Sequence, residues 1–142
     1  MKKGFTARQS VFIAVPKEKV WEALVTPSLI KEYFFGTETI SDFKKGSSII
    51  YRGEWDGKTY EDKGTILEVI PNKLLKYNYW SSMSPLEDTP ENYSDITYLL
   101  KEEKEGTIFE VEQDNCRSEE VKKHSEENWK AVMNNMKLML EK

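Results

Sequence analysis

Alternating apolar and polar positions over residues 5–15 predict a β-strand near the start of the chain. Pro16 follows and is suited to open a helix, because the first helical turn has no internal partner for its N–H groups and proline has no N–H. Val20, Trp21 and Leu24 recur at helical spacing and would form the inner side of this short helix. The chain is therefore expected to begin with a strand that runs directly into a helix.

A second short helix is predicted over residues 27–34. Thr26 can cap it, and Pro27 fits its first position. Its apolar residues recur at helical spacing: Leu29, Ile30, Tyr33 and Phe34. Gly36 is a typical helix stop.

Residues 38–115 change to the pattern of β-strands joined by turns. Isoleucine, valine, tyrosine, threonine and tryptophan are concentrated in six segments, 38–43, 47–55, 58–70, 73–82, 93–102 and 107–115. Turn residues link them, at Lys45-Gly46, Asp56-Gly57, Pro71-Asn72 and Glu105-Gly106. Links this short predict an antiparallel meander, because parallel strands need crossovers of about a dozen residues or more. Segment 82–92 is long and acidic enough to form a mobile loop.

The last pattern, over residues 118–140, predicts a long amphipathic helix. Its apolar stripe comprises Val121, Trp129, Val132, Met136, Met139 and Leu140, and glutamates and lysines cover the other side. Ser118 can cap the helix, and Glu119 and Glu120 complement the dipole of its first turn. About 24 residues at about 1.5 Å each give a helix roughly 36 Å long, enough to lie across a whole sheet.

Length and composition favour one globular domain over residues 1–142, with 38% hydrophobic and 32% charged residues. No apolar run approaches the roughly 18–20 residues that cross a bilayer, so we expect no membrane span. The single cysteine, Cys116, cannot form an internal disulfide, and we interpret it as an incidental thiol of a cytoplasmic protein. The net charge of −4 and the dispersed lysines argue against nucleic-acid binding, which normally shows as a basic stripe.

The alternation within the strands predicts a tyrosine-rich interior. Tyr77 and Tyr79 share one face of their strand, and Tyr98 and Gln113 are expected to face inward from the following strands. A buried tyrosine hydroxyl needs a partner or water, so these residues favour a partly wet cavity over a dry core. The alternative is that they simply pack, with their hydroxyls reaching the surface at strand ends.

Catalytic and metal-binding patterns are sparse. His124 is the only histidine, and its position about 140° from the inner stripe of the last helix places it at the surface. Zinc sites of histidine and cysteine lack ligands, and no glycine-rich phosphate loop occurs, so we expect no metal and no cofactor. A tyrosine could act as an acid or oxyanion donor, but the sequence identifies no base beside one.

Seven segments, taken in order, resemble the SRPBCC superfamily, also called START-like or Bet-v-1-like. They are IAVPKEKVWEAL (13–24), TPSLIKEYF (26–34), DFKKGSSI (42–49), GTILEVIPNKLLKYNY (64–79), SDITYLL (94–100), GTIFEVEQ (106–113) and NWKAVMNNMKLML (128–140). Within the superfamily the chain is most similar to the family related to the activator of the heat-shock protein 90 ATPase. The resemblance implies an α+β helix-grip fold, in which six to seven antiparallel strands curve around a long C-terminal helix and two short helices follow the first strand.

The chain departs from the family pattern at three places. Gly46-Ser47 replaces a pair of glycines, Asn128 replaces the glycine before the helix tryptophan, and Tyr33 stands where many members have tryptophan. These differences leave the expected fold unchanged but weaken any transfer of ligand preference.

The sequence is compatible with three functions. The first is binding of a small hydrophobic molecule, lipid-like or aromatic as in polyketides and flavonoids, in a cavity between sheet and helix, with no catalysis required. The expected ligand-binding residues are Tyr33, Phe34, Tyr51, Tyr77, Tyr79, Tyr98, Gln113, Trp129, Met133 and Met136. The second is a cyclase- or hydrolase-like enzyme acting on such a ligand. The third, implied by the family resemblance, is a chaperone partner in the stress response; in each case we expect a monomer.

Overall fold

The strands form one antiparallel sheet that curves around the last helix. A computed structural model describes residues 4–55, 57–82 and 84–142. Within these residues, seven strands lie in the spatial order β1-β7-β6-β5-β4-β3-β2. Their bounds are β1 (Phe5–Ile13), β2 (Glu38–Ser41), β3 (Ser48–Trp55), β4 (Lys58–Ile70), β5 (Leu74–Ser81), β6 (Ser94–Glu103) and β7 (Gly106–Cys116).

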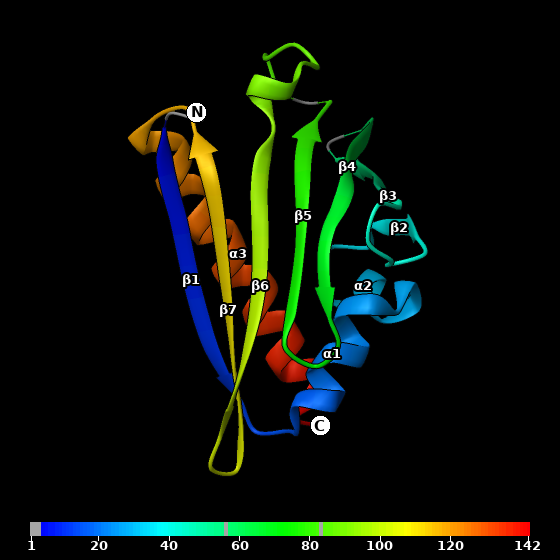
Figure 1. Cartoon of the computed structure of the whole chain (residues 1–142), viewed down its shortest axis with the longest axis vertical. Coiled ribbons are helices and arrows are strands. Elements are labelled where there is room, and N and C mark those ends of the chain that lie inside the picture. The colour runs from blue at the N-terminus through cyan, green and yellow to red at the C-terminus, as the bar shows by residue number, and fades with distance from the viewer. Residues whose placement is uncertain (1–3, 56, 83) are drawn as a thin grey trace.

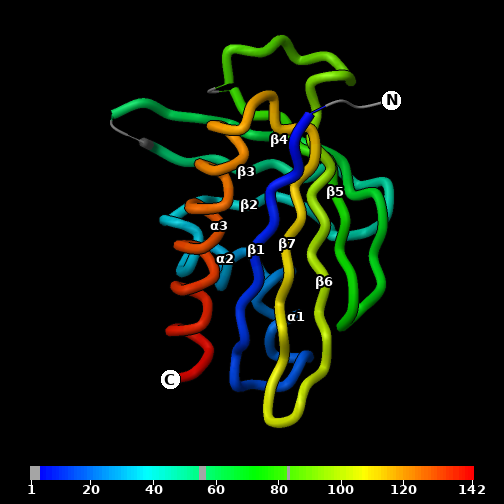
Figure 2. Tube along the Cα trace, turned by 90° about the vertical axis from the view of Figure 1, so that its left-hand side faces the viewer, coloured from blue at the N-terminus to red at the C-terminus, as the bar shows by residue number. Residues whose placement is uncertain are grey.

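The three α-helices all lie on one side of this sheet. They are α1 (Lys17–Val25), α2 (Pro27–Tyr33) and α3 (Glu119–Leu140), and a short 3-10 helix, η1 (Pro90–Asn92), precedes β6. Figure 1 shows α3 running behind the sheet, with α1 near the C-terminus and α2 next to β2. In Figure 2, β3 and β4 reach across toward α3 and give the sheet its curvature. This arrangement confirms the α+β helix-grip fold.

Element boundaries differ from the sequence prediction by a few residues at two places. The predicted strand over 5–15 ends at Ile13, and Pro16 is the N-cap of α1 rather than its first residue, with the Lys19 N–H donating to the Pro16 carbonyl (3.0 Å). The segment predicted over 38–43 ends as β2 at Ser41, because Phe43 takes a positive φ of 54° that an extended strand does not allow.

The core fills the space between α3 and the middle of the sheet. Trp129, Val132, Met133 and Met136 are the buried residues of α3, as the apolar stripe predicts in part. They join one hydrophobic cluster with inward-facing residues of the strands, among them Ile13, Ile66, Tyr77, Ile96 and Phe109. The Ser118 side chain caps α3 by accepting from the Val121 N–H (3.2 Å), as predicted.

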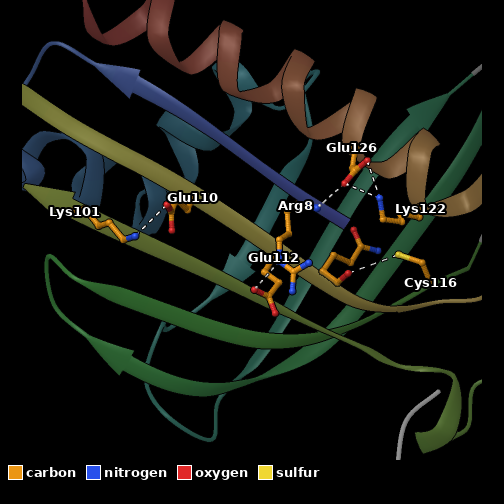
Figure 3. A network of polar contacts seen from close by, with 8 residues as sticks. Arg8, Lys101, Glu110, Glu112, Cys116, Lys122 and Glu126 are labelled. Carbon is orange, nitrogen blue, oxygen red and sulfur yellow. Dashed lines mark hydrogen bonds and ion pairs between the residues drawn. The ribbon is translucent and has the colours of Figure 1, made fainter. Parts of the chain in front are cut away.

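Polar contacts join the N-terminal half of α3 to the edge strand β1 (Figure 3). The Arg8 backbone N–H donates to Glu126 Oε2 (3.0 Å), and Lys122 Nζ contacts the same carboxylate (3.2 Å). The Gln9 side chain adds a hydrogen bond to the Glu126 carbonyl (3.0 Å). Glu126 and Lys122 face β1. The side of α3 that carries Ser125 and Asn128 is directed toward β3 and β4, where the sheet curves (Figure 2).

Candidate functional site

A cavity of about 440 Å³ lies between the N-terminal half of α3, the end of α2 and the inner face of β3 to β7. Seven of its fifteen lining residues are aromatic, and they come from five different elements or their ends. These are Phe34, Phe35, Tyr51, Tyr60, Tyr77, Tyr79 and Trp129. The volume falls within the range of about 300–1,000 Å³ that is typical of small-molecule sites.

Ring contacts organise the aromatic wall around Phe34, the residue that ends α2. Its ring stacks on Tyr51 with centroids 5.8 Å apart and planes at 18°, and it meets Trp129 edge to face at 6.0 Å. Tyr51 in turn lies 6.0 Å from Tyr77. Offset-stacked and edge-to-face pairs are the favourable arrangements of aromatic rings, so the wall is held in place before any ligand arrives.

The strand register places a carboxylate in this wall. Tyr51 on β3 pairs with Asp62 on β4, which pairs with Ser81 on β5, so the three side chains form a row across one face of the sheet. Asp62 is only 9% exposed, and its Oδ2 accepts a hydrogen bond from the Tyr79 hydroxyl (2.8 Å). Its Oδ1 is buried and has no hydrogen-bond partner among the described residues.

Burial controls the ionisation of the groups around the cavity. Loss of solvent raises the pKa of the Asp62 carboxyl above its ordinary value, although contacts with Ser81, Tyr79 and the Ser82 backbone act in the opposite direction. Burial also raises the pKa of Tyr51 to about 12, and it raises those of Tyr77 and Tyr79 well above the ordinary value. The phenols are therefore neutral at physiological pH and offer ring faces and hydroxyl groups.

A second polar feature joins the sheet to α3. Tyr77, Ile96 and Gln113 follow one another in register across β5, β6 and β7. The Trp129 indole N–H donates to Gln113 Oε1 (2.9 Å), which fixes the orientation of the tryptophan ring over this row. This hydrogen bond satisfies the buried indole N–H and sets one wall of the cavity.

Comparisons with known proteins agree with this architecture. Residues 14–141 match the family described as Activator of Hsp90 ATPase homolog 1-like protein. The chain belongs to this family. A comparison with curated proteins finds no match.

Three solved structures are similar to this chain, one of them in sequence as well as in fold. The solution structure of ChR145 from Cytophaga hutchinsonii is 46% identical, with a TM-score of 0.85, and the match covers 99% of this chain and 97% of that one. The Aha1 dimer from Colwellia psychrerythraea is 18% identical, with a TM-score of 0.77 and 97% of each chain covered. DynU16, a protein in the dynemicin biosynthetic locus, is 17% identical, with a TM-score of 0.82, and the match covers 98% of this chain and 48% of that one.

The cavity brings together six of the ten residues that the sequence analysis selected. These six are Phe34, Tyr51, Tyr77, Tyr79, Gln113 and Trp129. The other four, Tyr33, Tyr98, Met133 and Met136, do not line it and are buried in the core. A role in ligand binding stays a prediction for all ten residues, and these four lie behind the cavity wall rather than on it.

Each of the four residues is held in the core by contacts that leave it almost no free surface. The Tyr33 hydroxyl donates to the Ala23 carbonyl (2.9 Å) between α1 and α2. The hydroxyls of Tyr98 and Tyr77 share a hydrogen bond (2.9 Å), and the Tyr98 ring meets the rings of Trp129 and Phe109 edge to face. Met133 and Met136 are at most 1% exposed, which fits their role as flexible fillers of the core.

The cavity also contains residues that the sequence analysis did not select. Asp62 and Tyr60 come from β4, Thr37 follows α2, and His124 and Asn128 stand at the rim on α3. His124 is exposed, as its helix position predicts, but it lies at the cavity mouth rather than away from it. The signal for β4 was the period-two series Tyr60, Asp62, Gly64 and Ile66, in which the apolar Ile66 marks the inner face.

Replacing Asp62 by asparagine is expected to change how stability depends on pH. A carboxyl whose pKa is raised on folding stabilises the folded state below its unfolded pKa, and that contribution is lost as pH rises through the folded pKa. The variant Asp62→Asn lacks this titration. The free energy of unfolding of the parent should therefore fall relative to that of the variant as the pH rises. The difference between them should change by on the order of 1 kcal/mol between about pH 4 and pH 8.

Urea denaturation of both proteins across this range measures the difference. Glu61→Gln is the matched control, because Glu61 is the adjacent residue on β4, half exposed and paired with Arg52 (2.8 Å). An Asp62→Asn curve that runs parallel to the parent, or that falls below it toward neutral pH, would contradict the assignment.

Within the described residues, no helix combines the length and apolar character needed to cross a membrane. The same residues include no group of three or more histidine, cysteine, aspartate and glutamate side chains placed to hold a metal ion.

Proposed function

We propose that the chain binds a small hydrophobic molecule, aromatic or lipid-like, in the cavity between the sheet and α3. The observation that supports this most directly is a cavity of about 440 Å³ in which seven of the fifteen lining residues are aromatic. Pockets of this size and composition are typical of small-molecule sites. The expected affinity is modest: about 20 ligand heavy atoms at about 0.3 kcal/mol each give about 6 kcal/mol, or a Kd of tens of micromolar.

Blocking the mouth of the cavity tests the proposal. Asn128 is an exposed residue of α3 that lines the cavity, whereas its neighbour Glu127 is exposed and does not. Asn128→Trp should weaken binding of a neutral aromatic probe, flavone, by about tenfold or more, because the indole occupies ligand space. Glu127→Trp adds the same side chain outside the cavity and should leave the affinity within about twofold.

Amide chemical-shift titration of the three proteins with flavone gives the affinities and maps the site. Loss of binding in Asn128→Trp alone supports the cavity. If no hydrophobic probe shifts a cavity residue at the limit of its solubility, whether neutral as flavone, anionic as a fatty acid or cationic as an aryl amine, the binding proposal fails.

An enzyme acting on the same ligand is the second candidate, and Asp62 is the observation that favours it. A buried carboxylate beside the Tyr79 hydroxyl is a pairing of a base with a hydrogen-bond donor, which acid–base catalysis requires. Product formation that disappears in Asp62→Asn while binding persists would support catalysis. Binding without turnover of any tested ligand would leave the binding function alone.

A chaperone partner, a monomeric state and a cytoplasmic location remain predictions. The family described by its relation to the Hsp90 ATPase activator supports the first of these. A pull-down with purified Hsp90 that recovers none of this chain would remove it, and sedimentation at micromolar concentration measures the oligomeric state.

A further inference from the structure

We propose that Asp62 is the polar anchor of the cavity and that the preferred ligand is a hydrophobic molecule carrying a protonated amine. This inference rests on the proposed binding function and specifies the chemical class of its ligand. It replaces the broad expectation of a lipid-like or aromatic molecule by a statement about charge: amines bind, and carboxylates such as fatty acids are rejected.

The hydrogen bonds of Asp62 leave acceptor capacity unused. An ionised carboxylate has about four lone-pair sites. Oδ2 accepts from the Tyr79 hydroxyl, and the Ser81 side chain and the Ser82 backbone also contact the carboxylate, but Oδ1 itself has no hydrogen-bond partner among the described residues, although Asp62 is only 9% exposed. A buried polar atom without a partner is rare and unfavourable, so it marks a place where a ligand group can be accommodated.

Oδ1 itself has almost no accessible surface, so a ligand must reach the carboxylate through a small side-chain movement. The terminal torsion of aspartate is broad, so a partial rotation about it, short of the two-fold exchange that would restore the same arrangement, can turn one oxygen toward the cavity at modest cost. Because Tyr79 lines the cavity beside Asp62, its hydroxyl can follow the rotation and keep one oxygen paired. The other oxygen is then available to an ammonium group.

The charge of the wall favours a cation. Among the described residues that line the cavity, Asp62 is the one aspartate, glutamate, lysine or arginine side chain. The next residue, Lys63, is directed to the other face of β4, where it pairs with Asp88 and lies 5.8 Å from the Trp80 ring. A ligand carboxylate would therefore meet a like charge, with no lysine or arginine among the described lining residues and with His124 at the exposed rim.

The aromatic wall favours a cation as well. Phe34, Tyr51, Tyr77 and Trp129 present ring faces or edges around the cavity, and a cation over a ring face is attracted to it. Burial keeps the tyrosines neutral by raising their pKa values, so they bring no competing negative charge. Burial likewise disfavours the negative charge of Asp62, and a bound ammonium would compensate that charge.

Three probes with one ring system and three charges test the inference. They are 2-naphthylmethylamine, 2-naphthylmethanol and 2-naphthoic acid, titrated at neutral pH into the full chain and followed by amide chemical shifts. We expect the amine to bind about tenfold or more tightly than the alcohol, and the acid to bind most weakly, because charge-assisted hydrogen bonds are the strong ones. The order of the three affinities tests the preference for a cation on the parent protein, without any substitution.

Variants then assign the preference to one residue. In Asp62→Asn the amine should lose its advantage and bind about as weakly as the alcohol, while in Glu61→Gln, with the same loss of charge outside the cavity, the order should persist. Equal binding of the three probes, tighter binding of the acid, or an amine preference that survives Asp62→Asn would overturn the inference and leave the proposed function intact. If none of the probes, nor flavone, shifts a cavity residue, the proposed function fails together with it.

Discussion

Gly64→Ala is expected to lower the free energy of unfolding by about 3 kcal/mol or more, the largest effect of any single methyl group considered for this chain. A Cβ built on Gly64 would overlap the backbone carbonyl oxygen of Asn78 on β5 and would lie 3.0 Å from its side-chain oxygen. The carbonyl oxygen is part of the β5 backbone, which cannot move by itself. The Asn78 Oδ1 is held in place because it accepts a hydrogen bond from the Thr65 N–H (2.7 Å). The clash must therefore be relieved by separating β4 from β5.

Gly46→Ala is the control for this prediction. Gly46 has a φ of +89°, so alanine is strained there, but nothing lies within 4 Å of the new methyl group. Its expected cost is about 1 kcal/mol. Thermal unfolding measures both variants: at about 2–4 °C per kcal/mol, Gly64→Ala should unfold roughly 6 °C or more below the parent and clearly below Gly46→Ala. Equal midpoints for the two variants would show that β4 and β5 do not approach each other this closely.

Gly64 also matters for the site, because it lies two residues after Asp62 on the same face of β4. Movement of β4 away from β5 would separate Asp62 from Tyr79. The close approach that makes the glycine necessary is therefore also what brings the carboxylate and the phenol into contact.

The second large effect is expected for the buried hydroxyl pair of Tyr77 and Tyr98. The two side chains are 1% and 5% exposed, and their hydroxyls lie 2.9 Å apart. Tyr77→Phe or Tyr98→Phe alone leaves the other hydroxyl without this partner, at a cost of about 1–3 kcal/mol. The Tyr51 hydroxyl is also close to both, and it limits the penalty by offering an alternative contact.

A double-mutant cycle isolates the interaction. Tyr77→Phe/Tyr98→Phe removes both hydroxyls, so the double variant should be more stable than the sum of the single effects by about 1 kcal/mol. Tyr93→Phe provides the comparison, because its hydroxyl bonds the exposed Asp88 and should contribute less than about 0.5 kcal/mol. Strictly additive effects in urea denaturation would mean that the two hydroxyls do not interact.

The arrangement of helices and strands could be predicted from sequence because it depends on local patterns. Trp129 and Met136 lie on one stripe at helical spacing, and Tyr77 and Tyr79 alternate with polar residues along a strand. These periods identify which side chains face inward. They do not determine how strands align, so the row of Tyr51, Asp62 and Ser81 becomes visible only once the register is fixed.

The same limit explains why some inward residues line the cavity while others are buried in the core. Tyr77 and Tyr98 are both inward and both tyrosine, yet only Tyr77 lines the cavity. Tyr98 pairs with Leu75 and Val111 and packs against the Trp129 and Phe109 rings, whereas Tyr77 pairs with Ile96 in the row that ends at Gln113. Whether an inward side chain meets the helix or a cavity depends on the curvature of the sheet, which no local pattern encodes.

The most direct test of this account is an isotope-filtered NOE experiment on the labelled protein with unlabelled 2-naphthylmethylamine. The account predicts contacts between the naphthyl protons and the side chains of Trp129, Tyr77 and Ile96, which line the cavity together. Contacts confined to the outer surface, for example to the exposed Leu138, would contradict it. Saturable binding without any contact to Trp129 would do the same.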